Sequence, residues 1–188
     1  MRIVAGTLRG RPLVAPKGHI VRPTADRTRQ AIFNVLEHAA WAPELDGLRV
    51  IDLFAGSGAM GLEAISRGAA SCLFIETDEA ARGAIRANAA SLGVADRVRI
   101  ERRDAAQLAP RAGADGPPFD LAFLDPPYRE DLADAALLRL ADGGWLAEGA
   151  IAVVERGARS VCPAPIGYET LAERVWGAAR VEFLSRAG

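Results

Sequence analysis

The stretch DLFAGSGAMG, residues 52–61, constrains the fold of this 188-residue chain more than any other feature. Its glycines follow the pattern G-x-G-x-x-G, and they are Gly56, Gly58 and Gly61. Alone, this pattern is a weak signal, but here it follows an apolar run typical of a buried strand (48–54) and opens a helical pattern (59–69). Glu76 ends the next apolar run, twenty residues after the first glycine. The combination is typical of a βαβ unit that binds a nucleoside-containing cofactor.

The rest of the chain continues the alternation of strands and helices. We expect further strands at 71–76, 97–102, 119–125 and 150–156. We expect helices at 78–93 and 129–144, with a short helix and loop at 105–118. Alternating strands and helices require right-handed crossovers, which predicts an α/β fold with a doubly wound, mostly parallel sheet. The tail 168–186 differs, because its two strands joined near Gly177 predict an antiparallel hairpin.

The N-terminal 47 residues carry a different pattern. Residues 1–20 alternate loosely around three glycines, which predicts a short β hairpin and loop. A helix is expected within RPTADRTRQAIFNVLEHAA, residues 22–40, with Thr24 or Asp26 as its cap. The turn-rich connector 41–47 is a candidate boundary, so we divide the chain into an N-terminal extension, 1–47, and a main domain, 48–188.

Charge is distributed unevenly along the chain. Residues 1–30 contain seven Lys or Arg and one acid, whereas the remainder contains 16 basic and 23 acidic residues. A basic arm on an acidic body suggests a polyanionic partner at one edge. A solvated arm remains an alternative, because Lys17 is the only lysine and arginine is favoured throughout the chain.

Several classes of protein have little support. Cys72, Cys162, His19 and His38 are isolated from one another, so we expect reduced thiols, no metal site and no Ser-His-Asp triad. The first 13 residues lack the apolar run of about 7–15 residues that a signal peptide needs. No apolar run approaches the length of about 18 residues that a membrane span needs. We therefore expect a cytoplasmic protein that uses no membrane.

Acidic residues near the strand ends indicate which cofactor binds. Asp52 lies just before the glycine turn, where a carboxylate would repel a pyrophosphate seated on the helix N-terminus. It suits a cofactor without phosphate and with positive charge, such as S-adenosylmethionine, although Asp52 could instead cap the turn. Glu76 could accept hydrogen bonds from both ribose hydroxyls, and Asp104 one from the adenine amino group. We add Ala55, in the glycine turn, and Ala105, after Asp104, to the predicted cofactor site.

The strand 119–125 ends in the sequence Asp-Pro-Pro-Tyr, from Asp125 to Tyr128. The prolines donate no hydrogen bonds, so the Asp125 carboxylate and the Pro126 carbonyl present two neighbouring acceptors. Two acceptors match the two N–H bonds of an exocyclic amino group, whose lone pair they would direct at a methyl donor. Tyr128 would offer a flat face on which a flipped base stacks. A structural Pro-Pro turn, with Tyr128 in the core, is the alternative.

These motifs resemble a known family. DLFAGSGAMGLEAISRGA, FIETD and LDPPY, preceded by RIVAGTLRGRPL and RPTADRTRQAIFNVL, are similar to the bacterial 16S ribosomal RNA guanine-N2 methyltransferase family over nearly the whole chain. The resemblance implies a Rossmann-like class I methyltransferase fold with a seven-stranded sheet whose last strand is antiparallel. It also implies transfer of a methyl group from S-adenosylmethionine to one guanine of 16S rRNA in the small subunit or its assembly intermediate. We expect a monomer and no DNA substrate.

The resemblance also implies the residues that meet RNA. Arg9 and Arg11 would bind phosphates, and a second group would line the entrance to the site. That second group is Arg22, Thr24, Arg27 and Arg29. Part of it could be structural, with Asp26 capping the helix and one arginine paired to it.

Three alternatives remain open at this point. The same chemistry could act on adenine-N6 of nucleic acid, although no segment is long enough for the target-recognition domain that a DNA enzyme generally needs. An NAD(P)-dependent oxidoreductase would explain the glycine turn but not Asp-Pro-Pro-Tyr or the basic arm. A non-catalytic RNA-binding assembly factor would need only the arm.

Overall fold

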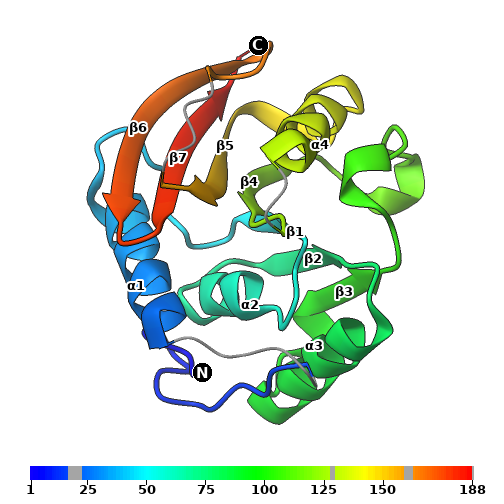
Figure 1. The fold of residues 1–188 in the computed structure, drawn as a ribbon. Coiled ribbons are helices and arrows are strands. Elements are labelled where there is room, and N and C mark those ends of the chain that lie inside the picture. Colours follow the sequence, from blue (N-terminus) through cyan, green and yellow to red (C-terminus); the bar gives the residue numbers. More distant parts are fainter. Residues whose placement is uncertain (17–22, 128–129, 159–162, 188) are drawn as a thin grey trace.

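The computed structural model describes residues 1–16, 23–127, 130–158 and 163–187 and contains a seven-stranded sheet (Figure 1). Its strands are β1 (Arg49–Leu53), β2 (Ser71–Ile75), β3 (Val98–Glu101), β4 (Phe119–Leu124), β5 (Leu146–Gly157), β6 (Tyr168–Trp176) and β7 (Ala179–Arg186). The spatial order is β3-β2-β1-β4-β5-β7-β6. All pairs from β3 to β5 are parallel, and β7 pairs antiparallel with both β5 and β6. The predicted α/β fold with an antiparallel C-terminal hairpin is confirmed.

Helices cover both faces of the sheet (Figure 1). The helices are α1 (Pro23–His38), α2 (Ala59–Ser66), α3 (Glu79–Leu92) and α4 (Glu130–Asp142). Helices α1, α2 and α3 share one hydrophobic core with the side chains of one sheet face, including Phe74 and Phe123. Helix α4 and the 3₁₀ turn Ala105–Gln107 pack on the other face, around Leu124 and Val154. Both faces of the inner strands are therefore buried, which explains their continuous apolar runs.

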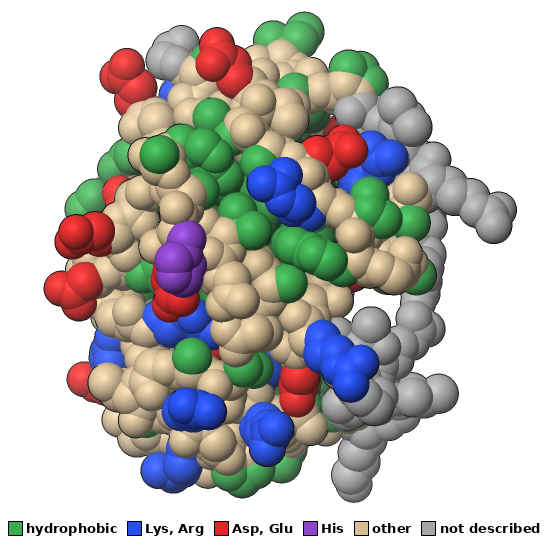
Figure 2. Space-filling model, turned by 90° about the vertical axis from the view of Figure 1, so that its left-hand side faces the viewer, with side chains coloured by type: hydrophobic (Ala, Val, Ile, Leu, Met, Phe, Trp, Pro, Cys, Tyr) green, Lys and Arg blue, Asp and Glu red, His purple; other side chains and the backbone are tan. Residues whose placement is uncertain are grey.

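The C-terminal hairpin extends the sheet beyond its parallel part. Strand β7 lies between β5 and β6 and carries Val181 and Phe183 into the core of α1. Strand β6 is the outer strand, and its Val175 is 51% exposed. Figure 2 shows a patch of hydrophobic side chains on this side of the molecule, above a group of Lys and Arg side chains in the lower half. The lower half contains the N-terminal segment (Figure 1).

The N-terminal segment packs onto the main domain rather than beside it. Ile3 and Leu13 are buried in the same core as α2 and the sheet, and the Phe33 ring of α1 lies 5.5 Å from the Phe123 ring of β4. The hairpin predicted for residues 1–20 reduces to a single antiparallel bridge between Arg2 and Pro12 in the described part. Several peptide groups of the segment hydrogen-bond to side chains of α2 and α3 instead, among them Val4, Ala5 and Val14, and the described part forms no regular strands.

The carboxylate of Glu63, in α2, holds this segment in place. It is fully buried and accepts hydrogen bonds from the backbone N–H groups of Val4 at 2.8 Å and Ala5 at 2.9 Å. It also pairs with Arg67 at 2.9 Å and with Arg29 of α1 at 3.4 Å. A buried carboxylate is stable only when such partners compensate its lost hydration. Glu63 therefore joins the N-terminal segment, α1 and α2 in one network.

Ser66, one turn further along α2, makes a second set of contacts with the same segment. Its hydroxyl donates to the carbonyl of Ala5 at 2.6 Å and accepts from Leu8 N–H at 3.0 Å, and its carbonyl accepts from Thr7 N–H at 2.8 Å. Gly6 has a φ of 77°, and a Cβ at this position would overlap the Ser66 carbonyl. Only glycine permits this close approach.

We predict that Glu63→Gln lowers the free energy of unfolding by about 3 kcal/mol, because the amide has one acceptor oxygen and leaves buried charges and N–H groups unpaired. Hydrogen exchange at the amides of Val4 and Ala5 should accelerate in the same variant. Denaturant unfolding and exchange measured by mass spectrometry check both effects.

Glu37→Gln is the matched control, because Glu37 pairs with the same Arg67 at 2.6 Å but its side chain is 35% exposed. Its replacement should cost less than about 1 kcal/mol. Equal destabilisation in the two variants would contradict the role assigned to Glu63.

Candidate active site

The candidate site lies where the order of the sheet reverses. Strands β1 and β4 are neighbours, but the chain continues from β1 toward β2 on one side and from β4 toward β5 on the other. Loops that leave two such strands diverge and open a crevice at the carboxyl ends, which is where ligands bind in sheets of this kind. The glycine turn follows β1 and Asp125 follows β4, so both predicted motifs lie at this crevice.

Each glycine of the turn has a separate structural reason. Gly56 and Gly58 have φ values of 54° and 76°, in the left-handed region that favours glycine, and Gly58 is the N-cap of α2. A Cβ on Gly61 would overlap the Cys72 sulfur and the Phe74 ring of β2, so glycine lets α2 pack directly against the sheet. These are the demands that the G-x-G-x-x-G pattern satisfies in dinucleotide-type folds.

Asp52 lies beneath this turn, and its side chain is 4% exposed. Its Oδ2 atom accepts a hydrogen bond from Gly61 N–H at 3.0 Å, so the capping alternative describes what Asp52 does in the structure. Burial raises the pKa of Asp52 well above its usual value, and the charges of Asp125 and Glu76 raise it further. The ionised form of Asp52 is therefore disfavoured in the ligand-free protein, and a cation bound in the crevice would stabilise it.

Glu76, at the end of β2, connects the glycine turn with α3. One carboxylate oxygen accepts from Gly56 N–H at 2.8 Å, and the other accepts from Asp78 N–H at 2.9 Å. Each oxygen retains a lone pair, and the side chain is partly exposed. Glu76 is therefore held in place with acceptor capacity left for two hydroxyl groups.

The remaining predicted cofactor residues lie around the same crevice. Asp104 is exposed and caps the 3₁₀ turn after β3, where it accepts from Ala106 N–H at 2.9 Å. Ala105 is 3% exposed and packs with the core on the α4 face. Ala55 is 8% exposed, and its carbonyl accepts from Gly58 N–H at 2.7 Å. The side chains of Ala55 and Ala105 are therefore buried in the hydrophobic cores beneath their loops.

Asp125 follows the last residue of β4, next to the partly exposed Pro126. Asp125 as a whole residue is exposed, yet enough protein surrounds its carboxyl group to raise its pKa to about 6 through loss of hydration. Its carboxylate has no hydrogen-bond or ion-pair partner among the described residues. Tyr128 lies outside the described residues. Asp125 and Pro126 therefore present acceptors that have no hydrogen-bond partner among the described residues.

Glu155, near the end of β5, was not predicted from the sequence. Leu124 of β4 pairs with Val154 of β5, so Asp125 and Glu155 follow paired positions on neighbouring strands. Loss of hydration first, and the Asp125 charge second, raise the pKa of Glu155 to about 7. The only signal for Glu155 in the sequence was an acidic residue near the end of a predicted strand. Its proximity to Asp125 could not be predicted, because it depends on the order of strands in the sheet.

Asn88, in α3, is a second residue that the sequence did not indicate. Its buried amide accepts from Val14 N–H at 2.8 Å and donates to the carbonyls of Val14 and Ser57, both at 3.0 Å. Ser57 lies in the glycine turn, so one side chain joins the N-terminal segment to the candidate site. The buried amide and these peptide groups therefore satisfy one another's hydrogen bonds.

The arginines predicted to meet RNA fall into different environments. Arg9, Arg11 and Arg27 are exposed, and Arg11 donates to the carbonyl of Ser91, one turn beyond Asn88. Arg29 is 3% exposed, and it pairs with Asp26 at 2.8 Å and with Glu63. We therefore withdraw Arg29 from the RNA-binding set, because its guanidinium is enclosed by the network around Glu63. Arg22 and the Thr24 side chain lie outside the described residues.

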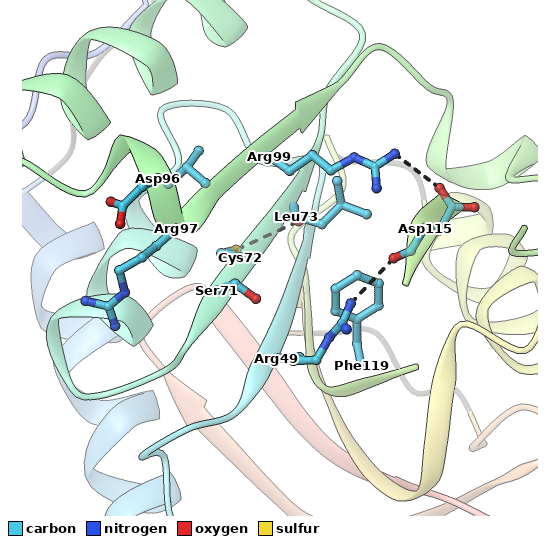
Figure 3. A pocket seen from close by; sticks show the side chains of 10 residues that line it. Arg49, Ser71, Cys72, Leu73, Asp96, Arg97, Arg99, Asp115 and Phe119 are labelled. Atoms are coloured by element: carbon cyan, nitrogen blue, oxygen red, sulfur yellow. Dashed lines mark hydrogen bonds and ion pairs between the residues drawn. The ribbon is translucent and has the colours of Figure 1, made fainter. Parts of the chain in front are cut away.

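A separate hollow of about 210 Å³ lies at the opposite edge of the sheet (Figure 3). Its lining includes Arg49, Ser71, Val98 and Phe119, which are the first residues of β1 to β4. Arg49 stacks on the Phe119 ring with its guanidinium carbon 5.0 Å from the ring centre. This hollow is remote from the carboxyl ends of the strands and is not part of the candidate site.

Two further observations concern metals and membranes. The described residues contain no group of three or more His, Cys, Asp or Glu side chains that could hold a metal ion. None of the helices in the described ranges is long and apolar enough to cross a membrane. Cys72 is a buried free thiol, and Cys162 lies outside the described ranges.

The strand order and the antiparallel C-terminal hairpin are those of a class I methyltransferase fold. The magnesium protoporphyrin IX methyltransferase of Synechocystis, solved with bound SAH, has this fold with a TM-score of 0.63 at 16% identity, over 90% of each chain. At this identity the likeness concerns the fold alone.

Closer relatives identify the family. The family described as "Conserved hypothetical protein 95" matches residues 1–185. The Escherichia coli protein named Ribosomal RNA small subunit methyltransferase D is 36% identical over 94% of this chain and 85% of its own. The solved structure of the Escherichia coli protein yhhF covers 100% of this chain and 98% of its own, with 35% identity and a TM-score of 0.83. The chain belongs to this methyltransferase family, as the sequence motifs indicated.

We predict that Asp52→Asn stabilises the ligand-free protein. The asparagine oxygen can keep the hydrogen bond from Gly61, while the cost of burying a charge disappears. A carboxyl group with a raised folded-state pKa does not destabilise the protein below about pH 4, where both states are protonated, and destabilises it increasingly as pH rises. The gain in free energy of unfolding should therefore be about 1 kcal/mol or more at pH 7.5 and vanish toward pH 4.

Thermal or denaturant unfolding across this pH range measures the effect. Asp96→Asn is the control, because Asp96 is exposed and should change stability by less than about 0.5 kcal/mol at either pH. Lower stability of Asp52→Asn at pH 7.5 would show that the ionised form is favoured by the fold.

Proposed function

We propose that this protein transfers a methyl group from S-adenosylmethionine to the exocyclic N2 amino group of a guanine in 16S rRNA. The proposed substrate is the small ribosomal subunit or its assembly intermediate, in the cytoplasm. The observation that carries the proposal is a pair of acceptors, Asp125 and Pro126, that lie beside the glycine turn and have no partner among the described residues. The relatives of the chain include Ribosomal RNA small subunit methyltransferase D.

The acidic residues of the crevice fit S-adenosylmethionine. Asp52 is buried beneath the turn, and Glu76 keeps acceptor capacity for ribose hydroxyls. Burial, and then the charges of Asp125 and Glu76, raise the pKa of Asp52, so the crevice favours a positive ligand over a pyrophosphate. An NAD(P) cofactor would place its phosphates next to these acids. When bound, S-adenosylmethionine supplies an electrophilic methyl group on a sulfonium, whose sulfur keeps the electron pair of the broken C–S bond.

The residues after β4 would prepare the amino group for transfer. The Asp125 carboxylate and the Pro126 carbonyl would each accept one N–H of the guanine N2 amine. Two such bonds hold the amine and favour a tetrahedral nitrogen, whose lone pair then forms the new N–C bond. The acceptors also stabilise the positive charge that develops on nitrogen. The methylated ammonium is acidic, so its proton can pass to Asp125 or water.

The exposed arginines of the N-terminal segment support an RNA substrate. Arg9, Arg11 and Arg27 lie on the surface without any carboxylate paired to them in the described part of the chain. Residues 11–14 run along α3 toward the glycine turn through the contacts of Arg11 and Asn88. Phosphates bound by this segment would lie on a surface that continues to the crevice.

The central prediction concerns the product. Methyl-labelled S-adenosylmethionine should label small ribosomal subunits or 16S rRNA, and digestion should yield N2-methylguanosine. Asp125→Asn, which leaves the glycine turn intact, should lower turnover by at least about 100-fold while cofactor affinity largely persists. Label in N6-methyladenine would instead favour the adenine alternative. Absence of label in every RNA tested would sink the proposal.

A second prediction concerns the basic segment. Replacing Arg9 and Arg11 by Ala should weaken RNA binding and reduce its salt dependence. The slope of log K against log salt should fall by about 0.7 for each phosphate that the variant no longer neutralises. Arg174→Ala is the control, because Arg174 is an exposed arginine on the distant strand β6. Binding titrations at several salt concentrations measure both, and an unchanged slope in the double variant would mean that the segment is only structural.

A further inference from the structure

Glu155 and Asp125 lie side by side at the carboxyl edge of the sheet. Side chains alternate along β5, and Ile151 and Val153 face α1, α2 and α3 whereas Val154 faces α4. Glu155 therefore faces the same side as Val153. On β4, Phe123 faces this side and Leu124 the other, so Asp125 continues on the side of Glu155. With Leu124 paired to Val154, the two carboxyl groups occupy neighbouring positions.

Neither carboxyl group has a compensating partner in the described protein. No hydrogen bond or ion pair is formed by Glu155 or Asp125 with the described residues. The next residue of β5 shows the contrast, because Arg156 faces α4 and pairs with Glu182 at 2.9 Å and Asp134 at 2.5 Å. Two adjacent acceptors that repel each other, and that no donor of the described residues bridges, suit a ligand that brings a row of donors.

The Watson–Crick edge of guanine carries such a row, with N1–H next to the two N–H bonds of the 2-amino group. Enzymes that act on an extruded base read this edge by hydrogen bonding. Adenine has an unprotonated N1 next to its amino group, and this nitrogen accepts hydrogen bonds. We propose that Glu155 accepts the N1–H of the target guanine while Asp125 and Pro126 hold its 2-amino group. This assignment rests on the proposed guanine-N2 activity and extends it to the choice of base.

The proposal makes Glu155 a residue that selects guanine over bases with an acceptor at N1. A carboxylate opposite an unprotonated N1 cannot form a hydrogen bond with it, because both groups are acceptors and their lone pairs repel each other. A site that hydrogen-bonds one group of a substrate rejects the analogue without it, because its own polar group is then unpaired. The binding energy of the cofactor and the transfer of the methyl group need no contribution from Glu155.

The test uses 2-aminopurine, which keeps the 2-amino group but has an acceptor at N1. The methylated guanosine is located by mapping the label to a defined fragment of 16S rRNA, and it is replaced by 2-aminopurine riboside in rRNA that is reconstituted into small subunits. The ratio of kcat/KM for guanosine to that for 2-aminopurine is measured at pH 8.5 with saturating S-adenosylmethionine. In Glu155→Gln the amide can accept from N1–H or donate to N1, so this ratio should fall by about 10- to 100-fold relative to wild type.

Glu155→Ala provides the second variant, since it can neither accept nor donate. It should lower kcat/KM for guanosine by about tenfold or more and should not lower kcat/KM for 2-aminopurine, because no unpaired carboxylate then faces N1. Glu169→Gln is the control for the chemical change, because Glu169 is exposed on β6, and its ratio should equal that of wild type.

The outcomes separate this inference from the proposed function. A wild-type enzyme that forms no N2-methylguanosine refutes both. An active wild type whose ratio is unchanged in Glu155→Gln, or a Glu155→Ala variant whose activity falls equally on both substrates, refutes the inference alone and indicates a structural role. Weaker S-adenosylmethionine binding in Glu155→Gln, with an unchanged ratio, would assign the carboxylate to the cofactor and also overturn the inference.

Discussion

The buried carboxylate of Glu63 connects parts of the chain that no strand or helix connects. It satisfies two N–H groups of the N-terminal segment and two arginines, Arg29 and Arg67. The Arg67 guanidinium also lies over the Phe33 ring of α1, with its carbon 4.6 Å from the ring centre. Without the Glu63 charge, the two buried arginines would lack an ion-pair partner and the two N–H groups would lack an acceptor. The N-terminal segment and α1 therefore depend on α2 for their position.

The position of the crevice residues also depends on α2. The helix begins at the glycine turn, and Gly61 in its first turn donates to Asp52. Asn88 joins the turn to the N-terminal segment from the other side. The charges of Asp125 and Glu76 raise the pKa of Asp52, and the charge of Asp125 raises the pKa of Glu155, so the ligand-free site carries electrostatic strain. Such strain is common where a protein is built to bind charge rather than to maximise its own stability.

Much of the fold followed from local patterns. The glycine turn, the parallel strands and the final hairpin lay where periodicity and spacing had indicated. The limits of elements were less predictable. Strand β5 begins at Leu146 rather than 150, because Leu146 pairs with Phe119 across an irregular register. The predicted N-terminal hairpin is only one bridge in the described residues, because several of its peptide groups hydrogen-bond to side chains of α2 and α3.

The sequence by itself determined the βαβ units, the glycine turn and the Asp-Pro-Pro sequence after β4, because each depends on residues close together in the chain. The tertiary structure decided which charges meet. It enclosed Arg29 with Asp26 and Glu63, and it brought Glu155 beside Asp125. These outcomes follow from the strand order and from the competition of buried charges for partners, and neither is encoded in local spacing.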